Sequence, residues 1–315
     1  MKLPVSWRLR DVVEFRVGGG VEEWCRELER AVKDGGEARR LLASLVRVCV
    51  ADEDSVVEVV SFWSTLVLAA EQEENAELAY EVLGLCGSAR SSLYRRPAPE
   101  KIEVDGDELW IRAVPTRQAA QRDTGFMVWP TAKILARYLR RERMAFEGRV
   151  ILELGAGVGL SGIACAAFAE SVILTDSNDD CLKALRYNAR LNDAEGEEKI
   201  TVEHLDFARL AEKTRRYDRV VASDVVCCDR DALALATAID LLLSKKGGLA
   251  VVAQPNARHR YGVDTFVAAL AENGLVFEAT STNDDPNLVL GLGDETNYFE
   301  WFIYSITRKG QKREF

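Results

Sequence analysis

The stretch Glu153-Leu-Gly-Ala-Gly-Val-Gly-Leu-Ser-Gly162 decides the fold of this 315-residue chain. It follows an apolar run at 149–154 and opens a run of small residues at 161–169, which predicts a strand, a tight turn and a helix. The amides at the start of that helix point toward any ligand bound at the turn. The backbone can turn sharply and approach such a ligand without a Cβ in the way at three glycines: Gly155, Gly157 and Gly159.

A carboxylate follows about twenty residues later, at Asp176, where the next apolar strand ends. A carboxylate at this place suits the two hydroxyls of an adenosine ribose. Residues 157–162 also fit G-x-G-x-x-G, so a nicotinamide dinucleotide is an alternative ligand. Three features favour S-adenosylmethionine: Glu153 two residues before the first glycine, the late position of the turn after a helical segment, and a terminal pair of strands.

Two further strand ends complete the predicted pocket. Asp206 follows the third strand, where a carboxylate can accept a hydrogen bond from the adenine amino group. Ser223 and Asp224 end the fourth strand, where methyl donor and acceptor are expected to meet. Ligands of open parallel sheets bind beyond the carboxyl ends of the strands. We therefore expect Gly155, Asp176, Asp206 and Asp224 to converge on one crevice.

Helix and strand patterns alternate from residue 128 onward, which predicts an α/β fold with a parallel sheet covered on both faces. Seven strands are expected in this Rossmann-like sheet. The last two, at 276–281 and 299–307, follow each other without a helix and predict an antiparallel edge. Ahead of the sheet, two short apolar runs within 101–113 flank Asp105-Gly106-Asp107, which predicts a hairpin.

The first part of the chain predicts helices. Apolar residues recur at helical spacing from Val21 to Leu28, and similar patterns continue to about residue 94. The segment 95–99 is rich in helix breakers and marks a boundary. We therefore expect a helical accessory domain over 1–98 and a ligand-binding domain with a leading β-hairpin over 99–315.

Composition narrows the class of partner. Forty-one basic and 51 acidic residues give a net charge of −10, which disfavours a nucleic-acid partner. The seven cysteines are irregularly spaced and form no C-x-x-C pair, so we expect no metal and a reducing compartment. No apolar run reaches about eighteen residues, so we expect no membrane association. The cytoplasm is the expected location, with the nucleus as the alternative, and a monomer is the expected state.

These motifs resemble the seven-β-strand protein-lysine methyltransferases of methyltransferase family 16 over about residues 100–308. The resemblance implies a class I methyltransferase sheet, S-adenosylmethionine as cofactor, a protein lysine as acceptor, and packing of Trp129 against the cofactor. The helical extension is most similar to that of the member that methylates eukaryotic elongation factor 2, which is therefore the candidate substrate. The resemblance rests on Gly125-Phe-Met-Val-Trp129-Pro130, Glu153–Gly162, Leu174–Asn178, Asn188–Asn192, Leu205-Asp206 and Ser223-Asp224-Val225.

One residue departs from the family pattern. The family motif after the fourth strand is usually Asp-x-x-Tyr, whereas Asp224-Val-Val-Cys227 lacks the aromatic hydroxyl. Asp224 is the expected catalytic residue, which orients the acceptor amine. The expected cofactor-binding residues are Trp129, Glu153, Gly155, Gly157, Gly159, Asp176, Asp206 and Ser223.

Three alternatives remain open from the sequence. A methyltransferase of this type can act on a small molecule or on another side chain, and a catalytically impaired scaffold can still bind the cofactor.

The basic loop at 256–261 is interpreted first as a solvated surface loop, and second as a segment that touches substrate.

Overall fold

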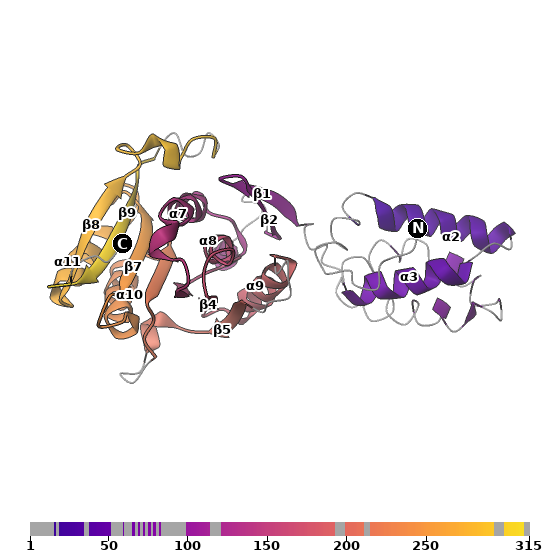
Figure 1. Ribbon diagram of the computed structural model, residues 1–315, viewed down its shortest axis with the longest axis horizontal. Coiled ribbons are helices and arrows are strands. Elements are labelled where there is room, and N and C mark those ends of the chain that lie inside the picture. The colour runs from indigo at the N-terminus through magenta and orange to yellow at the C-terminus, as the bar shows by residue number, and fades with distance from the viewer. Residues whose placement is uncertain are drawn as a thin grey trace. The chain divides into compact units, whose positions relative to one another are not determined.

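The computed structural model divides the chain into two compact units, Met1–Pro99 and Glu100–Phe315, which are treated separately below (Figure 1). Each unit has its own hydrophobic core. The breaker-rich residues 95–98 lie outside the part of the chain that the structure describes. The structure describes residues 20–34, 38–51, 99–113, 121–192, 199–210, 215–292 and 299–311, and single positions between 16 and 82.

The first unit contains two described helices, α2 (Gly20–Asp34) and α3 (Ala38–Ala51). They pack against each other along their apolar faces, where Trp24, Leu28 and Leu45 are buried. Val59, Leu66 and Val82 belong to the same core, although most of the chain around them is outside the described residues. The helical spacing seen in the sequence thus reflects one buried face for each of the two described helices.

The second unit is built on a seven-stranded sheet with the order β5-β4-β3-β6-β7-β9-β8. The five strands from β5 to β7 are parallel, and β9 is antiparallel to both β7 and β8. This order confirms the predicted α/β fold with a seven-stranded, Rossmann-like sheet and an antiparallel edge. The strands are β3 (Val150–Leu154), β4 (Ser171–Asp176), β5 (Ile200–His204), β6 (Arg219–Ser223), β7 (Leu249–Pro255), β8 (Leu275–Ser281) and β9 (Trp301–Arg308).

Helices cover both faces of this sheet (Figure 1). One face packs against α7 (Pro130–Arg141), α8 (Leu160–Cys165) and α9 (Asp179–Asn192), and the other against α10 (Asp229–Leu242) and α11 (Val263–Glu272). Side chains alternate between the two cores along a central strand: Val220 and Ala222 face one, and Val221 faces the other. Burial on both faces explains why the parallel strands read as continuous apolar runs.

A β-hairpin precedes the sheet, as the sequence predicts. Its strands β1 (Glu100–Val104) and β2 (Asp107–Ile111) pair antiparallel around Asp105 and Gly106. Both turn residues have positive φ, 46° and 91°, which is the geometry that Asp-Gly turns favour.

Two asparagines of α9 hold this hairpin against the rest of the second unit. Asn188 exchanges hydrogen bonds with the backbone of Arg112, and its Nδ2 also donates to the carbonyl of Val158. Asn192 makes the matching pair of bonds to the backbone of Trp110. The polar spacing Asn188–Asn192 therefore has a structural cause, because it holds β2 against α9.

Candidate active site

The glycine turn lies between β3 and α8, beside the place where the strand order reverses between β3 and β6. Gly155, Gly157 and Gly159 all have positive φ, at 62°, 55° and 90°. A Cβ on Gly155 would lie 2.7 Å from Val225 Cγ1, and one on Gly157 would lie 2.8 Å from the carbonyl oxygen of Gly125. Side chains are therefore excluded at two of these positions by neighbours as well as by backbone conformation.

Glu153 supports the glycine turn from the interior of the protein. Its side chain is fully buried, and Oε2 accepts a hydrogen bond from the amide of Gly162 at 2.9 Å. Burial raises the pKa of this carboxyl to about 8, against the lowering effect of the bonds from Gly162 and Ser161. Glu153 thus holds the first turn of α8 and does not line an open surface, so we assign it to positioning the glycine turn in place of direct cofactor contact.

Asp176, at the end of β4, is tied to the glycine turn. Its Oδ2 accepts from the amide of Gly157 at 3.1 Å, and its Oδ1 accepts from the amide of Asn178 at 2.9 Å. The side chain that caps α9 is Asn178, whose Oδ1 accepts from the amides of Asp180 and Cys181. Asp176 therefore does not cap α9, and each of its carboxylate oxygens retains a lone pair that can accept from a ligand hydroxyl.

Asp206 follows β5 and borders an open cavity of about 530 Å³. One carboxylate oxygen accepts from the amide of Ala208 at 3.0 Å, and the other lies 3.3 Å from Nε of Arg209. The next residue, Phe207, lies 4.0 Å from the position of a Cβ on Gly155, so this strand end also reaches the glycine turn. The cavity is lined by Ser177, His204, Leu205, Asp206, Arg209 and Leu210.

Trp129 stands at the N-terminus of α7 and is half-buried. Its indole Nε1 donates to the carbonyl of Thr124 at 2.9 Å, which closes the segment ahead of the helix into a turn. The close approach of Gly125 to Gly157 places this turn against the glycine turn. Trp129 is thereby brought to the same end of the sheet as the glycine turn.

Asp224 lies directly beyond β6 in a strained backbone conformation, with φ of 55°. Its side chain is only 5% exposed, and Thr131 of α7 donates to Oδ2 at 3.3 Å. Burial raises the pKa of this carboxyl, while Arg260 and Thr131 lower it. A positive φ costs a non-glycine residue free energy and persists only where the surrounding structure imposes it. Such residues are frequent at functional sites.

Gln254 of β7 supports this turn, and no sequence motif indicates that role. The side chain is fully buried, and with its amide oriented toward the turn, Oε1 accepts from the amides of Val225 at 3.0 Å and Val226 at 3.2 Å. Ser223, the last residue of β6, is partly buried and pairs with Ala253 of the same neighbouring strand. The turn after β6 is therefore held by the neighbouring strand β7.

Arg260 is a second residue at this site that the sequence motifs do not identify. It belongs to the loop between β7 and α11, and its Nη2 lies 2.5 Å from Oδ1 of Asp224. Its Nη1 donates to Sγ of Cys227 at 3.6 Å. Arg258, His259 and Tyr261 of the 256–261 loop are exposed, as expected for a solvated segment, whereas Arg260 pairs with the predicted catalytic carboxylate.

Cys227 at this site is not an activated nucleophile. Partial burial raises the pKa of the Cys227 thiol, and Arg260 only partly offsets this effect. Among the described residues, no group of three or more His, Cys, Asp or Glu side chains is arranged to hold a metal ion. In the same part of the chain, none of the helices has the length and apolar character needed to cross a membrane.

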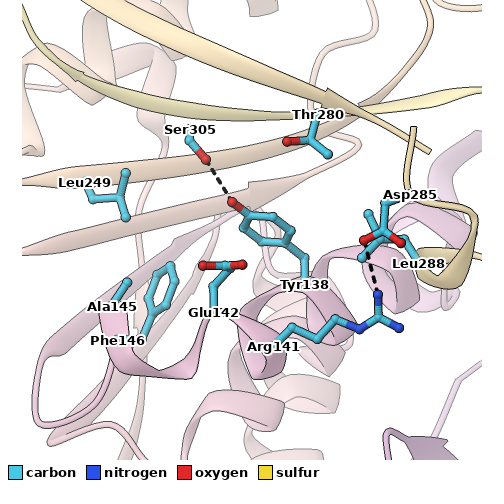
Figure 2. Close-up of a pocket in the computed structure, with 10 residues that line it drawn as sticks. All are labelled: Tyr138, Arg141, Glu142, Ala145, Phe146, Leu249, Thr280, Asp285, Leu288 and Ser305. Atoms are coloured by element: carbon cyan, nitrogen blue, oxygen red, sulfur yellow. Dashed lines mark hydrogen bonds and ion pairs between the residues drawn. The ribbon is translucent and has the colours of Figure 1, made fainter. Parts of the chain in front are cut away.

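A second pocket of about 260 Å³ lies at the opposite end of the sheet (Figure 2). It is bordered by the last turn of α7 and by Leu249, the first residue of β7, whereas Asp224 follows the carboxyl end of the parallel neighbour β6. Inside it, the Tyr138 hydroxyl and Ser305 Oγ form a hydrogen bond of 3.0 Å, and Arg141 pairs with Asp285. None of the predicted site residues lines this pocket.

Comparison with known proteins identifies the family. A profile described as lysine methyltransferase, methyltransferase family 16, matches residues 105–273, which is more than half of the chain. The chain belongs to this family. The family resemblance expected from the sequence motifs is thus confirmed. Methyltransferases of this family use S-adenosylmethionine as methyl donor, which is therefore the cofactor of this protein.

Individual relatives differ in the side chain named in their titles. The methyltransferase is 29% identical to protein-lysine N-methyltransferase EEF2KMT of Mus musculus over 244 residues, which cover 69% of this chain and 70% of that protein. It is 35% identical to histone-arginine methyltransferase METTL23 of Homo sapiens over 122 residues, 38% of this chain and 63% of that protein. A solved ribosomal protein L11 methylase of Lactobacillus delbrueckii subsp. bulgaricus is similar at 23% identity and a TM-score of 0.41, covering 57% of this chain and 78% of that one.

The strand ends of the methyltransferase provide groups that suit this methyl donor. The turn at Gly155 and Gly157 exposes backbone without side chains, and Asp176 beside it offers acceptors for ribose hydroxyls. Asp206 offers a further acceptor on the cavity beyond β5. Contacts through Val225, Phe207 and Asp176 join all four strand ends to the one glycine turn.

Proposed function

We propose that this methyltransferase methylates a lysine side chain of a protein, with elongation factor 2 as the first candidate. The observation that carries the proposal is the Asp224 carboxylate, which is nearly buried next to the glycine turn and held there by Thr131. A carboxylate in this position can accept a hydrogen bond from an amine. The choice of acceptor is supported by the name of the relative EEF2KMT. The alignment with this relative covers more than two thirds of each of the two chains.

The proposed cofactor residues follow from their places at the strand ends. Gly155, Gly157 and Gly159 shape the turn under the cofactor, and Asp176 accepts from its ribose hydroxyls. Asp206 accepts from the adenine amino group, Ser223 borders the reacting end, and Trp129 covers the cofactor from α7. Glu153 contributes by holding the turn.

The residues of this chain then act mainly by positioning. When bound, S-adenosylmethionine supplies an electrophilic methyl group on a positively charged sulfur. Transfer would require the acceptor nitrogen to be neutral, with its lone pair in line with the S–CH3 bond, and would release the thioether product and a proton to water. Asp224 aligns the amine for this in-line displacement, which is where orientation lowers the barrier.

The acceptor must first lose a proton. A lysine with the reference pKa of 10.4 pays about 4–5 kcal/mol to be neutral at pH 7. Partial exclusion of water and nearby positive charge both lower the pKa of such an amine. The electrostatic environment of Asp224 therefore bears directly on the rate.

A second candidate acceptor is an arginine side chain of a protein. It is favoured by the 35% identity to the histone-arginine methyltransferase METTL23 over 122 residues. The same Asp224 carboxylate can accept two hydrogen bonds from a guanidinium. A small-molecule acceptor and a non-catalytic scaffold are the remaining alternatives. The scaffold is supported by Cys227, which stands in place of the family tyrosine.

One experiment separates these candidates. Purified protein is incubated with methyl-labelled S-adenosylmethionine and either purified elongation factor 2 or a eukaryotic cell lysate, and labelled products are located by mass spectrometry. Methylation of an elongation factor 2 lysine is the expected result, with Asp224→Asn protein as the negative control. Label on an arginine supports the second candidate, and label on metabolites alone, or no label, contradicts both protein-acceptor proposals.

We further propose that the protein works in the cytoplasm as a monomer. The six described cysteines are free thiols, four of them buried, which suits a reducing compartment. Size-exclusion chromatography with light scattering and imaging of a tagged chain test these two points.

A further inference from the structure

The guanidinium of Arg260 occupies the acceptor end of the site. It lies between the carboxylate of Asp224, at 2.5 Å, and the sulfur of Cys227, at 3.6 Å. The Asp224 side chain is 5% exposed and that of Arg260 is 26% exposed, so solvent screens this pair less than a surface ion pair. Arg260 thus reaches the two residues that frame the proposed acceptor position.

The loop that carries Arg260 is anchored at both ends. At its start, Asn256 donates to Glu300 Oε2 at 2.6 Å, and the amide of Asn256 donates to the Glu300 carbonyl. At its end, Gly262 has a φ of 86°, and a Cβ there would lie 2.6 Å from the backbone of Cys228. The loop is therefore held directly against the Cys227–Cys228 segment, and the approach of Arg260 to Asp224 is a built feature.

The ion pair of Asp224 and Arg260 changes the net charge next to an acceptor amine. Asp224 alone would present a negative charge, which holds a lysine ammonium in its protonated and unreactive form. With Arg260 bound to it, the pair is neutral overall, and a nearby cation lowers the pKa of an amine. We propose that Arg260 is a specificity-determining residue that cancels the charge of Asp224, so that the site accepts the lysine amine in its neutral, nucleophilic form. This inference rests on the proposed lysine acceptor.

The other ionisable groups around the pair are few. Cys227 and Cys228 lie on the segment beyond β6, and Asp231 of α10 contributes a negative charge near Cys227. Thr131 is the contact from α7 and carries no charge. On the loop itself, Arg258 is exposed and acts on Glu300. His259 packs edge-on against Phe299.

The first test is the pH dependence of kcat in three variants, with elongation factor 2 as acceptor. In Arg260→Gln the acidic limb is expected to move up by about one pH unit, which lowers kcat about tenfold at pH 7 and restores it near pH 9.5. KM for the acceptor is expected to stay the same or fall, because the unpaired carboxylate attracts the ammonium. Arg260→Lys keeps a cation and is expected to keep most of the wild-type profile. Arg258→Gln is the matched control and is expected to leave the profile unchanged.

A second readout needs no acceptor. S-adenosylmethionine carries a positive sulfur and its demethylated product does not, so the ratio of their affinities reports the charge near the transferred methyl. Because Arg260→Gln removes the cation beside the Asp224 carboxylate, this variant is expected to raise the preference for S-adenosylmethionine by about fivefold or more in calorimetry.

The outcomes separate this inference from the proposed function. An unchanged affinity ratio in Arg260→Gln overturns the role of Arg260, as does an unshifted kcat profile or an equal shift in Arg258→Gln. If wild-type protein leaves elongation factor 2 unmodified, the acceptor assignment fails, and the affinity ratio still decides whether Arg260 sets the charge of the site.

Discussion

Asp224 combines strain, burial and charge in one residue. Its φ is positive, and the two residues after it donate to Gln254 when that amide is oriented toward the turn. Its carboxylate is held by Thr131 and Arg260. Asp224→Asn keeps the shape of the side chain and removes its charge. We expect methyl transfer to fall by about 10²-fold or more, because the acceptor amine loses its orienting partner. Binding of S-adenosylmethionine in calorimetry is expected to survive.

The control for this prediction is Asp229→Asn, since Asp229 is an exposed carboxylate at the start of α10 that accepts from Thr265. It is expected to leave methyl transfer unchanged. Joint loss of cofactor binding and methyl transfer in Asp224→Asn would contradict the role assigned to Asp224.

Glu153 makes stability depend on pH. Its pKa is about 8 in the folded protein and 4.5 as the reference value, because burial disfavours the charged form. The folded state therefore holds a proton that the unfolded state releases. Its contribution to stability is complete below about pH 4.5 and is lost as pH rises through about 8, on the order of a few kcal/mol.

Glu153→Gln removes this titration. We expect the melting temperature of wild-type protein to fall between pH 5 and pH 9 more steeply than that of the variant, as measured by calorimetry in matched ionic strength. Parallel curves for the two proteins would show that the buried carboxyl does not titrate in this range.

Among the elements, the hairpin depends on α9. Asn188 is fully buried and satisfies both the amide and the carbonyl of Arg112 as well as the carbonyl of Val158. Asn188→Ala leaves these buried backbone groups without partners, which costs about 1–3 kcal/mol for each unsatisfied group. We expect a lower melting temperature and faster hydrogen exchange at Trp110 and Arg112. Lys183→Ala, on the exposed side of α9, is the control and is expected to change neither.

The sequence carries most of the information about elements and less about contacts between them. Apolar runs, the glycine turn and the Asp-Gly pair predict the strands, the turn and the hairpin, because each depends on neighbours in the chain. The sequence does not predict Arg260 and Gln254 as site residues. The loop that contains Arg260 is interpreted first as a solvated segment and only second as one that touches substrate, and no motif marks Gln254. Their roles arise only when the end of β7 and the following loop pack beside the end of β6.

Glu153 illustrates the same limit in another way. Its position before the first glycine is correctly part of the motif, but a sequence does not say whether a carboxylate faces a ligand or the interior. The bond to Gly162 and the complete burial answer that question only after the fold is known.

For the molecule as a whole, the two units have separate cores. No residue of the core around α2 and α3 belongs to either core of the sheet unit, as far as the described residues show. We therefore expect a chain of residues 100–315 to fold and to bind S-adenosylmethionine with nearly the affinity of the full chain. Calorimetric titration of both proteins checks this, and an unfolded or non-binding 100–315 chain would show that the first unit is needed for the site.

The place of β9 in the sheet has a consequence for biosynthesis. This strand lies between β7 and β8, yet both of these precede it in the chain. During translation, β8 has no partner in the sheet until β9 has left the ribosome, and the exposed edge of β7 stays open for the same time. A nonsense mutation just before Trp301 would thus remove two strand pairings at once and leave two unpaired edges, which are sites for aggregation. Such a truncated chain is expected to need chaperones and to be degraded, although every residue of the proposed active site would already have been made.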